Sequence, residues 1–374
     1  MSKRTLFQVI LLGIMLAVPG TASAQAASPS TGSSAMILNV VVAGKSGAPI
    51  ADLQPGDFKL FDNKQAVNAL SVQAAGGAGE TDPPVEALLL LDSVNLDFTT
   101  VANERKQLIG FLRKNGGQLA LPTALILLTD SGAQMPALPT RDGNALAAHL
   151  KEDETGLPTF ARNTGAYSAE ARWQVSLRSL NLILSAESKR PGRKLLLWLS
   201  TGWPAFSQMT ARNTSQNQER LFNSIAALST GMRRAGITLY SIDPTGAGQE
   251  QVALEKAPES LTERRGGSRM PTMESGTGKL YYQDFLKGVE TPKDADYGNL
   301  LLGVLATQSG GQVFYGNNDL PWMITKCIAD ASGYYVITFN LPAAARANEY
   351  HSIEVQVDKP GLTARTRTGY YAQP

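Results

Sequence analysis

Near-continuous apolar runs alternate with amphipathic segments through the middle of the chain, and this alternation constrains the fold more than any other feature. The runs lie at residues 85–91, 123–129, 195–199 and 237–242. Strands buried on both faces read as continuous apolar runs, and helices between them supply the crossovers of a parallel sheet. We therefore expect an α/β domain with a mostly parallel sheet covered by helices.

Helical spacing of apolar residues fills the segments between these runs and after them. The segments with this pattern are residues 102–114, 168–187, 218–235 and 319–331. Gly236 follows the third segment and is expected to stop it, because glycine is favoured just past a helix C-terminus. Asp319 is expected to cap the fourth segment, with Pro321 in its first turn.

The two ends of the chain have a different, alternating pattern that is typical of half-buried strands. This pattern covers residues 38–73 and residues 333–373. We expect the two segments to pack together as a small β-sandwich-like module, with the α/β domain at 85–332 inserted between them. Within that domain, residues 244–296 are polar and rich in Gly and Pro, which indicates a long loop.

The first 24 residues have the organisation of a signal peptide. Lys3 and Arg4 precede an apolar run at 6–18, and an A-x-A cleavage site ends at Ala24. The run is too short for a membrane span, which needs about 20 residues, and no later segment is a candidate span. We expect an exported protein, periplasmic or extracellular, with a flexible leader at 25–37.

Charge and cysteine content limit the partners and the chemistry. The formal charge is +2, and loss of Lys3 and Arg4 with the signal peptide would bring it to 0. A neutral chain gives no reason to expect nucleic acid as a partner. Cys327 is the single cysteine, so it forms no intramolecular disulfide, and its helical apolar surroundings predict a buried thiol.

Polar residues stand directly after several of the apolar runs. Asp92, Ser200 and Asp243 each follow such a run. Parallel sheets bind ligands at the carboxyl ends of their strands. These three positions are therefore the first candidates for a functional site.

The order of these features resembles the von Willebrand factor type A (vWA) domain, and in particular a bacterial family of exported, vWA-related proteins. The resemblance spans most of residues 38–371 and implies a Rossmann-type, vWA-like sheet. Its carrying stretches are Gly47-Ala48-Pro49-Ile50 with Asp57-Phe58, residues 88–95, Pro191-Gly192-Arg193-Lys194, Ser200-Thr201-Gly202-Trp203-Pro204 and Arg365-Thr366-Arg367-Thr368-Gly369-Tyr370-Tyr371.

The resemblance also implies a metal-ion site in a degenerate form. A metal-binding vWA domain has D-x-S-x-S after its first strand, a loop Thr and a later Asp. Here Asp92 supplies the first acid, but Val94 and Leu96 stand at the two Ser positions. The implied ligand set is Asp92, Asn95, Thr164 and Ser200.

With one carboxylate in that set, we expect at most weak Mg²⁺ binding and no other cofactor, since Mg²⁺ needs several oxygen ligands. The alternative is that Asp92 caps the following turn or accepts hydrogen bonds from loop amides.

The sequence offers few residues for catalysis or for binding zinc. His149 lies in a helical segment and His351 in an alternating strand, away from the strand ends, so neither a Ser-His-Asp site nor a zinc site is expected.

We therefore expect a binding or adhesion-type protein rather than an enzyme, acting on a protein partner through the loops at the top of the sheet. Trp203 is expected to be an exposed anchor there. Two alternatives remain open: a metal-assisted hydrolase using Asp92 and its neighbours, and a purely structural envelope component. The predicted partner-binding residues are Asp92, Ser93, Asn95, Thr164, Thr201 and Trp203.

Overall fold

The structure, a computed structural model, describes most of the chain after the predicted signal peptide. The described residues are 35–45, 47–50, 52–76, 85–135, 138–152, 166–203, 215–245 and 285–374. The predicted signal peptide, Thr164 and the greater part of the predicted loop at 244–296 lie outside these ranges.

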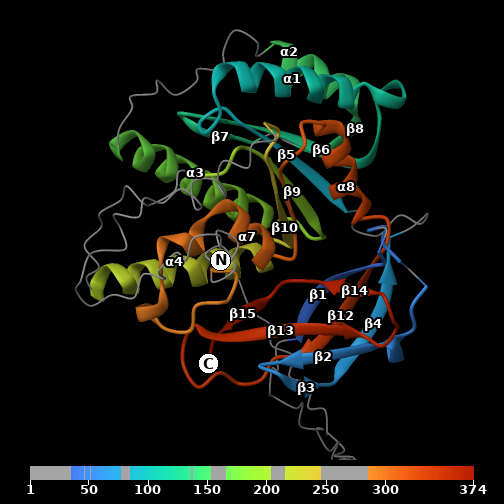
Figure 1. Cartoon of the computed structure of the whole chain (residues 1–374), viewed down its shortest axis with the longest axis vertical. Coiled ribbons are helices and arrows are strands. Elements are labelled where there is room, and N and C mark those ends of the chain that lie inside the picture. The colour runs from blue at the N-terminus through green and yellow to red at the C-terminus, as the bar shows by residue number, and fades with distance from the viewer. Residues whose placement is uncertain are drawn as a thin grey trace, which may run out of the picture. The chain divides into compact units, whose positions relative to one another are not determined.

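A seven-stranded mixed sheet forms the centre of the α/β part (Figure 1). Its strands are β5 (Glu86–Asp92), β6 (Gln118–Thr129), β7 (Gly132–Gln134), β8 (Thr140–Asp142), β9 (Lys194–Leu199), β10 (Ile237–Ile242) and β11 (Val313–Phe314). Strands β6, β5, β9, β10 and β11 run parallel, whereas β7 and β8 pair antiparallel with β6. The α/β class expected from the apolar runs is confirmed.

The strand order contains one reversal that positions the candidate site. The sheet runs β11-β10-β9-β5-β6-β7, so the first strand of the domain, β5, lies between β6 and β9. The chain winds away from β5 in one direction through β6 and β7, and in the other through β9, β10 and β11. The switch point therefore lies at the carboxyl ends of β5 and β9, the position at which open α/β sheets bind their ligands.

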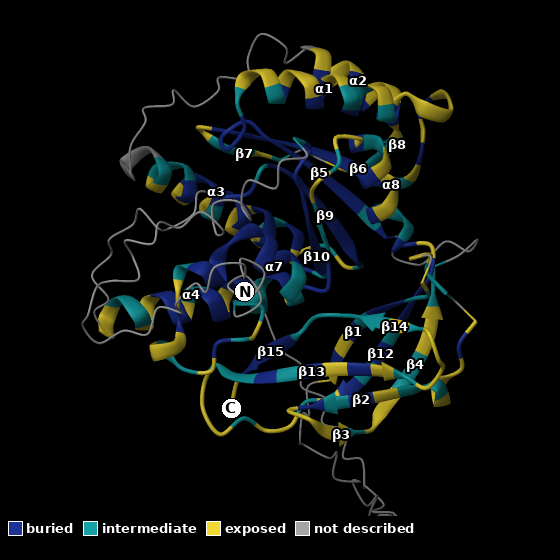
Figure 2. Cartoon of the chain, in the orientation of Figure 1, coloured by how far each residue is buried: buried dark blue, intermediate teal, exposed yellow. Residues whose placement is uncertain are grey.

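Helices cover both faces of this sheet, with α1, α2 and α8 on one face and α3, α4 and α7 on the other (Figure 1). Their bounds are α1 Phe98–Leu112, α2 Gly143–Glu152, α3 Ala166–Glu187, α4 Ser215–Arg234, α7 Leu302–Gln308 and α8 Leu320–Ala329. The strands between the two layers are buried along their length, as Figure 2 shows for β5, β9 and β10. No helix in the described ranges is both long and apolar enough to span a bilayer.

The helix signals in the sequence are confirmed where the structure describes them. Helix α4 ends at Arg234, and Gly236 follows with φ +66°, a conformation that glycine adopts without strain. Asp319 caps α8 by accepting a hydrogen bond from the backbone N–H of Trp322 at 3.0 Å. Cys327 is buried on the inner face of the same helix, as expected.

Strands from both ends of the chain pair with each other to form two four-stranded sheets. One sheet has the order β14-β1-β12-β4 and the other β15-β13-β2-β3, so each combines early and late segments of the sequence. The strands are β1 Ala35–Ala43, β2 Phe58–Asp62, β3 Gln65–Val67, β4 Ala69–Ala75, β12 Tyr334–Asn340, β13 Glu349–Val357, β14 Thr363–Arg365 and β15 Gly369–Ala372.

The inner faces of these two sheets share one apolar core, so the module is a β-sandwich. Two boundaries differ from those expected. Strand β1 begins at Ala35, inside the predicted leader at 25–37, because Met36 alternates in register with Leu38 and enters the core. Strand β4 runs to Ala75 because it pairs with β12 along its length.

Part of the predicted loop at 244–296 is also ordered against the core. Val289 and Ala295 are buried in the cluster beneath α4 and α7, and Val289 donates its backbone N–H to the hydroxyl of Tyr371 at 3.2 Å. Residues 285–296 of the predicted loop are therefore packed against the core. Two buried apolar side chains in a polar segment were too weak a signal to reveal this packing.

Asp330 joins the α/β part to the sandwich. It follows α8, and its carboxylate accepts hydrogen bonds from the hydroxyl of Tyr240 on β10 and from the guanidinium of Arg365 on β14. The backbone carbonyl of Asp330 accepts a third from Arg193 at 2.9 Å. The carboxylate and the carbonyl of Asp330 therefore tie the end of α8 to β10, to β14 and to the residue that precedes β9.

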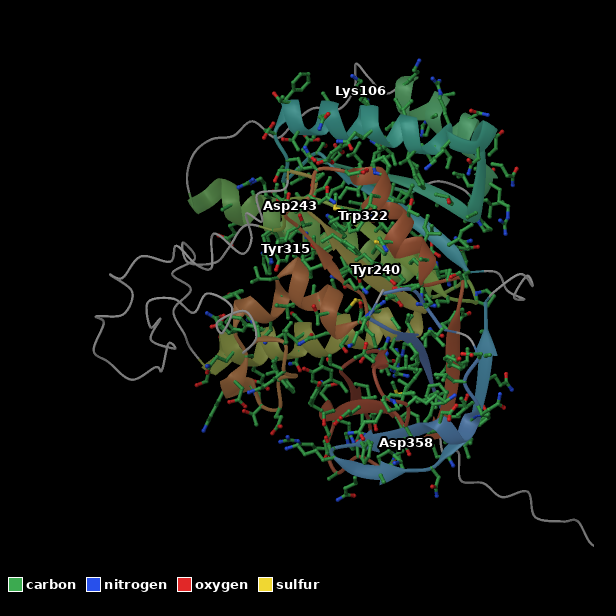
Figure 3. All side chains as sticks on the ribbon, turned by 45° about the vertical axis from the view of Figure 1, so that its right-hand side comes forward. Lys106, Tyr240, Asp243, Tyr315, Trp322 and Asp358 are labelled. Atoms are coloured by element: carbon green, nitrogen blue, oxygen red, sulfur yellow. The ribbon has the colours of Figure 1, made fainter. Side chains whose placement is uncertain are left out.

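We predict that Asp330→Ala lowers the free energy of unfolding by about 2–4 kcal/mol, because it leaves the Tyr240 hydroxyl and the Arg365 guanidinium without their acceptor. The control is Asp358→Ala, which removes the solvent-exposed pair with Lys59 and is expected to cost below about 1 kcal/mol. Figure 3 shows Tyr240 inside the molecule and Asp358 on the sandwich. Urea unfolding measures both, and equal losses would contradict the assigned role of Asp330.

Candidate functional site at the switch point of the sheet

Asp92 and Ser200 lie on the two strands that flank the switch point. Asp92 is the last residue of β5, and Ser200 directly follows β9. The strands are neighbours in parallel register, with Leu91 opposite Leu199. The structure therefore brings these two predicted site residues together at the position where such sheets bind ligands.

The carboxylate of Asp92 accepts four hydrogen bonds from the protein itself. Its Oδ1 accepts the backbone N–H groups of Val94 and Asn95, both at 2.9 Å. Its Oδ2 accepts the side-chain amide of Asn95 at 2.8 Å and the indole Nε1–H of Trp198 at 2.9 Å. A carboxylate has about four lone-pair sites, so the internal donors occupy all of them.

Burial and hydrogen bonding act on the pKa of Asp92 in opposite directions. The side chain is fully buried, and this desolvation raises the pKa of Asp92 above its ordinary value. Hydrogen bonds from Asn95 and Trp198 oppose the rise, because they stabilise the carboxylate form. Asp92 is therefore a buried acid held by neutral donors.

The loop after Asp92 is fixed from several sides. Ser93 donates both its backbone N–H and its hydroxyl to the carbonyl of Leu128 at the end of β6, at 2.9 and 2.7 Å. Val94 packs into the core on one face of the sheet and Leu96 into the core on the other. Apolar side chains thus anchor the loop at the two positions where a metal-binding vWA domain has serines.

Asn95 connects this loop to its neighbours. Its side-chain amide also donates to the hydroxyl of Ser176 on α3 at 2.9 Å, and its backbone carbonyl accepts the hydroxyl of Thr201 at 3.3 Å. The Oδ1 of Asn95 is buried and has no hydrogen-bond partner. Helix α3 and the loop after β9 therefore close over Asp92.

Trp203 is not the exposed anchor that the sequence suggested. Its side chain is only 2% exposed, and its ring packs edge-on against Trp198 with centroids 5.3 Å apart. Trp203 directly follows Gly202, whose φ is +95°. Residues with side chains rarely adopt this φ, so the turn before Trp203 favours glycine. Asp92, Ser93 and Asn95 are buried too, whereas Thr201 is half-buried.

This arrangement does not fit a divalent cation. A hard cation needs free carboxylate or carbonyl lone pairs, whereas both oxygens of Asp92 face N–H groups. Ser200 exchanges hydrogen bonds with Gly202, at 3.2 and 3.3 Å. Thr164 lies outside the described residues, and within the described ranges no three His, Cys, Asp or Glu side chains form a metal-holding group.

Glu104 is a second buried acid near the same strand ends. It lies on the inner face of α1 between Val101 and Leu108, and neither of its carboxyl oxygens has a hydrogen-bond partner. Burial first, and then the negative charges of Asp92 and Asp243, raise the pKa of Glu104 well above its ordinary value of 4.5. Glu104 therefore keeps its proton to a higher pH than an exposed glutamate.

Three residues of this site were missed from the sequence: Trp198, Ser176 and Glu104. Trp198 carries an N–H group in an otherwise aliphatic strand, which was an available signal for a buried acceptor. Ser176 and Glu104 are polar residues on the apolar faces of their helices. Helical spacing could have marked both of them, but not the partner that each one faces.

Three exposed aromatic side chains lie in the segments that follow the carboxyl ends of β5 and β11. Phe98 begins α1 shortly after Asp92 and is 69% exposed. Tyr315 directly follows β11 and is 50% exposed, and Trp322 in the first turn of α8 is 44% exposed. The end of β11 adjoins Asp243, whose backbone N–H donates to Phe314 at 2.8 Å (Figure 3). We name Phe98, Tyr315 and Trp322 the aromatic rim.

The two histidines lie on α2 and in the sandwich. His149 is on the exposed side of α2. His351 is buried in the sandwich, where its Nδ1 contacts Asp62 at 2.7 Å and its ring stacks on Tyr370. The same Asp62 accepts the hydroxyl of Tyr370 at 2.6 Å. This constellation fills the interior between the two sandwich sheets.

Comparison with known proteins gives no assignment: no protein-family model matches the chain, and no curated protein matches it.

We predict that the stabilisation contributed by Glu104 declines as the pH rises above about 4.5, and that Glu104→Gln removes this decline. The unfolded chain releases the Glu104 proton near the ordinary pKa of 4.5, whereas the folded chain holds it to the raised pKa. Between those two pH values the folded state binds more protons, so the stabilisation from Glu104 is full below 4.5 and declines at about 1.4 kcal/mol per pH unit.

Urea unfolding of the wild type and Glu104→Gln between pH 4 and pH 8 measures the effect. The difference between the two proteins isolates Glu104 from Asp92, whose pKa burial also raises. The glutamine variant is expected to become relatively more stable as the pH rises. A constant difference across the range would show that Glu104 is ionised in the folded protein.

Proposed function

We propose that this chain is an exported, vWA-like binding module that contacts a protein partner at the carboxyl edge of its sheet, without a metal and without catalysis. The observation that carries the proposal is the saturation of Asp92 by four internal donors at the switch point. The strand end that binds ligands in other doubly wound sheets carries Asp92 here, and Asp92 holds the loops after β5 and β9 in place.

The sheet order supports the vWA-like part of the proposal. In order along the sheet, the strands β7-β6-β5-β9-β10-β11 correspond to the doubly wound order 3-2-1-4-5-6, with the third strand antiparallel. Asp92 ends β5, which is strand 1 of this order. The vWA resemblance places its metal-binding acid at the end of that strand. The proposal thus combines a doubly wound topology with an altered site.

The absence of catalytic geometry in the described ranges supports a binding role over the hydrolase alternative. A hydrolase needs an activated nucleophile or a metal-bound water. Asp92 has no free lone pair for either task, and the hydroxyl of Ser200 bonds to the backbone of Gly202. The carboxylate of Asp92 and the hydroxyl of Ser200 are thus both engaged by groups of the protein itself.

The aromatic rim is the proposed contact surface, in place of the buried residues Asp92, Ser93, Asn95 and Trp203. Exposed aromatic side chains are enriched at protein interfaces, since they bury large areas at low entropic cost. The rim lies on or beside α1 and α8, which pack on the central sheet, so a partner would meet a preorganised surface. Thr201 stays in the proposed surface because it is half-buried.

We predict that Trp322→Ala and Phe98→Ala each lower partner recovery at least about tenfold, as expected for anchors worth more than about 1.4 kcal/mol. The measurement is quantitative capture from the envelope and secreted fractions of the source cell, with the purified protein as bait. The control is Leu70→Ala, which removes an equally exposed apolar side chain from the sandwich strand β4. Equal recovery by all four proteins would remove the rim from the proposal.

A further inference from the structure

Arg233 and Arg367 are two half-buried arginines without an acidic partner. Arg233 lies in the last turn of α4, and Arg367 lies between β14 and β15. Within the described ranges neither side chain forms a hydrogen bond or an ion pair, and the Nε of Arg233 is buried with no partner at all. Buried guanidinium groups are ordinarily paired.

The segment that carries Arg367 is held in place on both sides. The hydroxyl of Thr366 donates to the carbonyl of Asn39 on β1 at 2.9 Å, and the backbone N–H of Thr368 donates to Gln308 at 3.2 Å. The turn after α7 packs closely against this segment: a Cβ added at Gly310 would lie only 2.8 Å from the backbone nitrogen of Arg367. The unpaired guanidinium therefore extends from a fixed backbone.

Arg365, two residues earlier, differs from Arg367 because its guanidinium has hydrogen-bond acceptors. Its guanidinium bonds to the carboxylate of Asp330 and to the carbonyl of Gly310. Among the residues that the structure describes, no acceptor forms a hydrogen bond with Arg367. Asp62 of the sandwich is engaged by His351 and Tyr370.

The two unpaired arginines also repel each other. Burial, and in addition the positive charge of Arg233, lower the pKa of Arg367 to about 10. Burial likewise lowers the pKa of Arg233, with a further contribution from Arg234. Helix α4 contacts β15 beside them, so the repulsion acts across the boundary between the α/β part and the sandwich.

We propose that Arg233 and Arg367 form a binding site for a small oxyanion, phosphate or a carboxylate, between the end of α4 and the β14–β15 segment. An oxyanion supplies the missing negative charge and accepts hydrogen bonds from both guanidinium groups. The planar fork of arginine matches the geometry of phosphate and carboxylate oxygens in bidentate pairs. Bound there, the anion fastens α4 to the sandwich.

The test is thermal unfolding of the full chain in inorganic phosphate, in succinate and in chloride, at equal pH and ionic strength. A site that is saturated about 100-fold above its Kd raises the Tm by several degrees, on the order of 3–6 °C. We expect such a rise with phosphate or with succinate, and the stronger of the two identifies the oxyanion class. The rise should be lost in Arg233→Gln and in Arg367→Gln.

The matched control is Arg234→Gln, which removes an exposed charge from the same helix turn and should keep the full anion response. Phosphate also stabilises proteins non-specifically by exclusion from their surface, so an equal Tm rise in all four proteins would mean an adventitious ion only. In chloride, Arg367→Gln should be at least as stable as the wild type, because the variant loses an unpaired buried charge. A less stable variant would show that Arg367 already has a structural partner and would overturn the proposal.

Discussion

The carboxylate of Asp92 holds together the loops at the carboxyl ends of the strands. It is fully buried, and its two oxygens accept two N–H donors each, from the turn that follows it, from Asn95 and from Trp198. A buried carboxylate without such donors would be strongly destabilising. The donors in turn fix the loop after β5, and through Asn95 they fix α3 and the loop after β9.

The buried carboxylate of Asp330 holds together the elements where the α/β part meets the sandwich. Asp330 bonds to Tyr240 on β10 and to Arg365 on β14, so the sandwich and the central sheet share one polar network. The early and late strands of the chain enclose the α/β part in the sequence and pair with each other in space. The surface that we propose for a partner therefore belongs to a unit whose central sheet and sandwich are joined by hydrogen bonds.

Local patterns predicted the elements well, and tertiary contacts explain what they missed. Continuous aliphatic runs identified β5, β6, β9 and β10, because strands buried on both faces need them. The fate of Trp203 could not be predicted, because its burial depends on the ring of Trp198, a partner that periodicity does not specify. Asp92 was placed correctly at a strand end, and one alternative considered from the sequence, a turn-capping carboxylate, describes the hydrogen bonds that it accepts from Val94 and Asn95.

We propose that Asp92 holds the protein's own loops and binds no cation. Calorimetric titration of the purified chain with Mg²⁺ and Mn²⁺ tests this proposal. If the internal donors occupy the carboxylate, neither ion gives a saturable heat at concentrations up to about 10 mM, and Asp92→Asn titrates like the wild type. Saturable binding in the wild type that disappears in Asp92→Asn would contradict the account, because it would show that a cation displaces the N–H groups of Asn95 and Trp198.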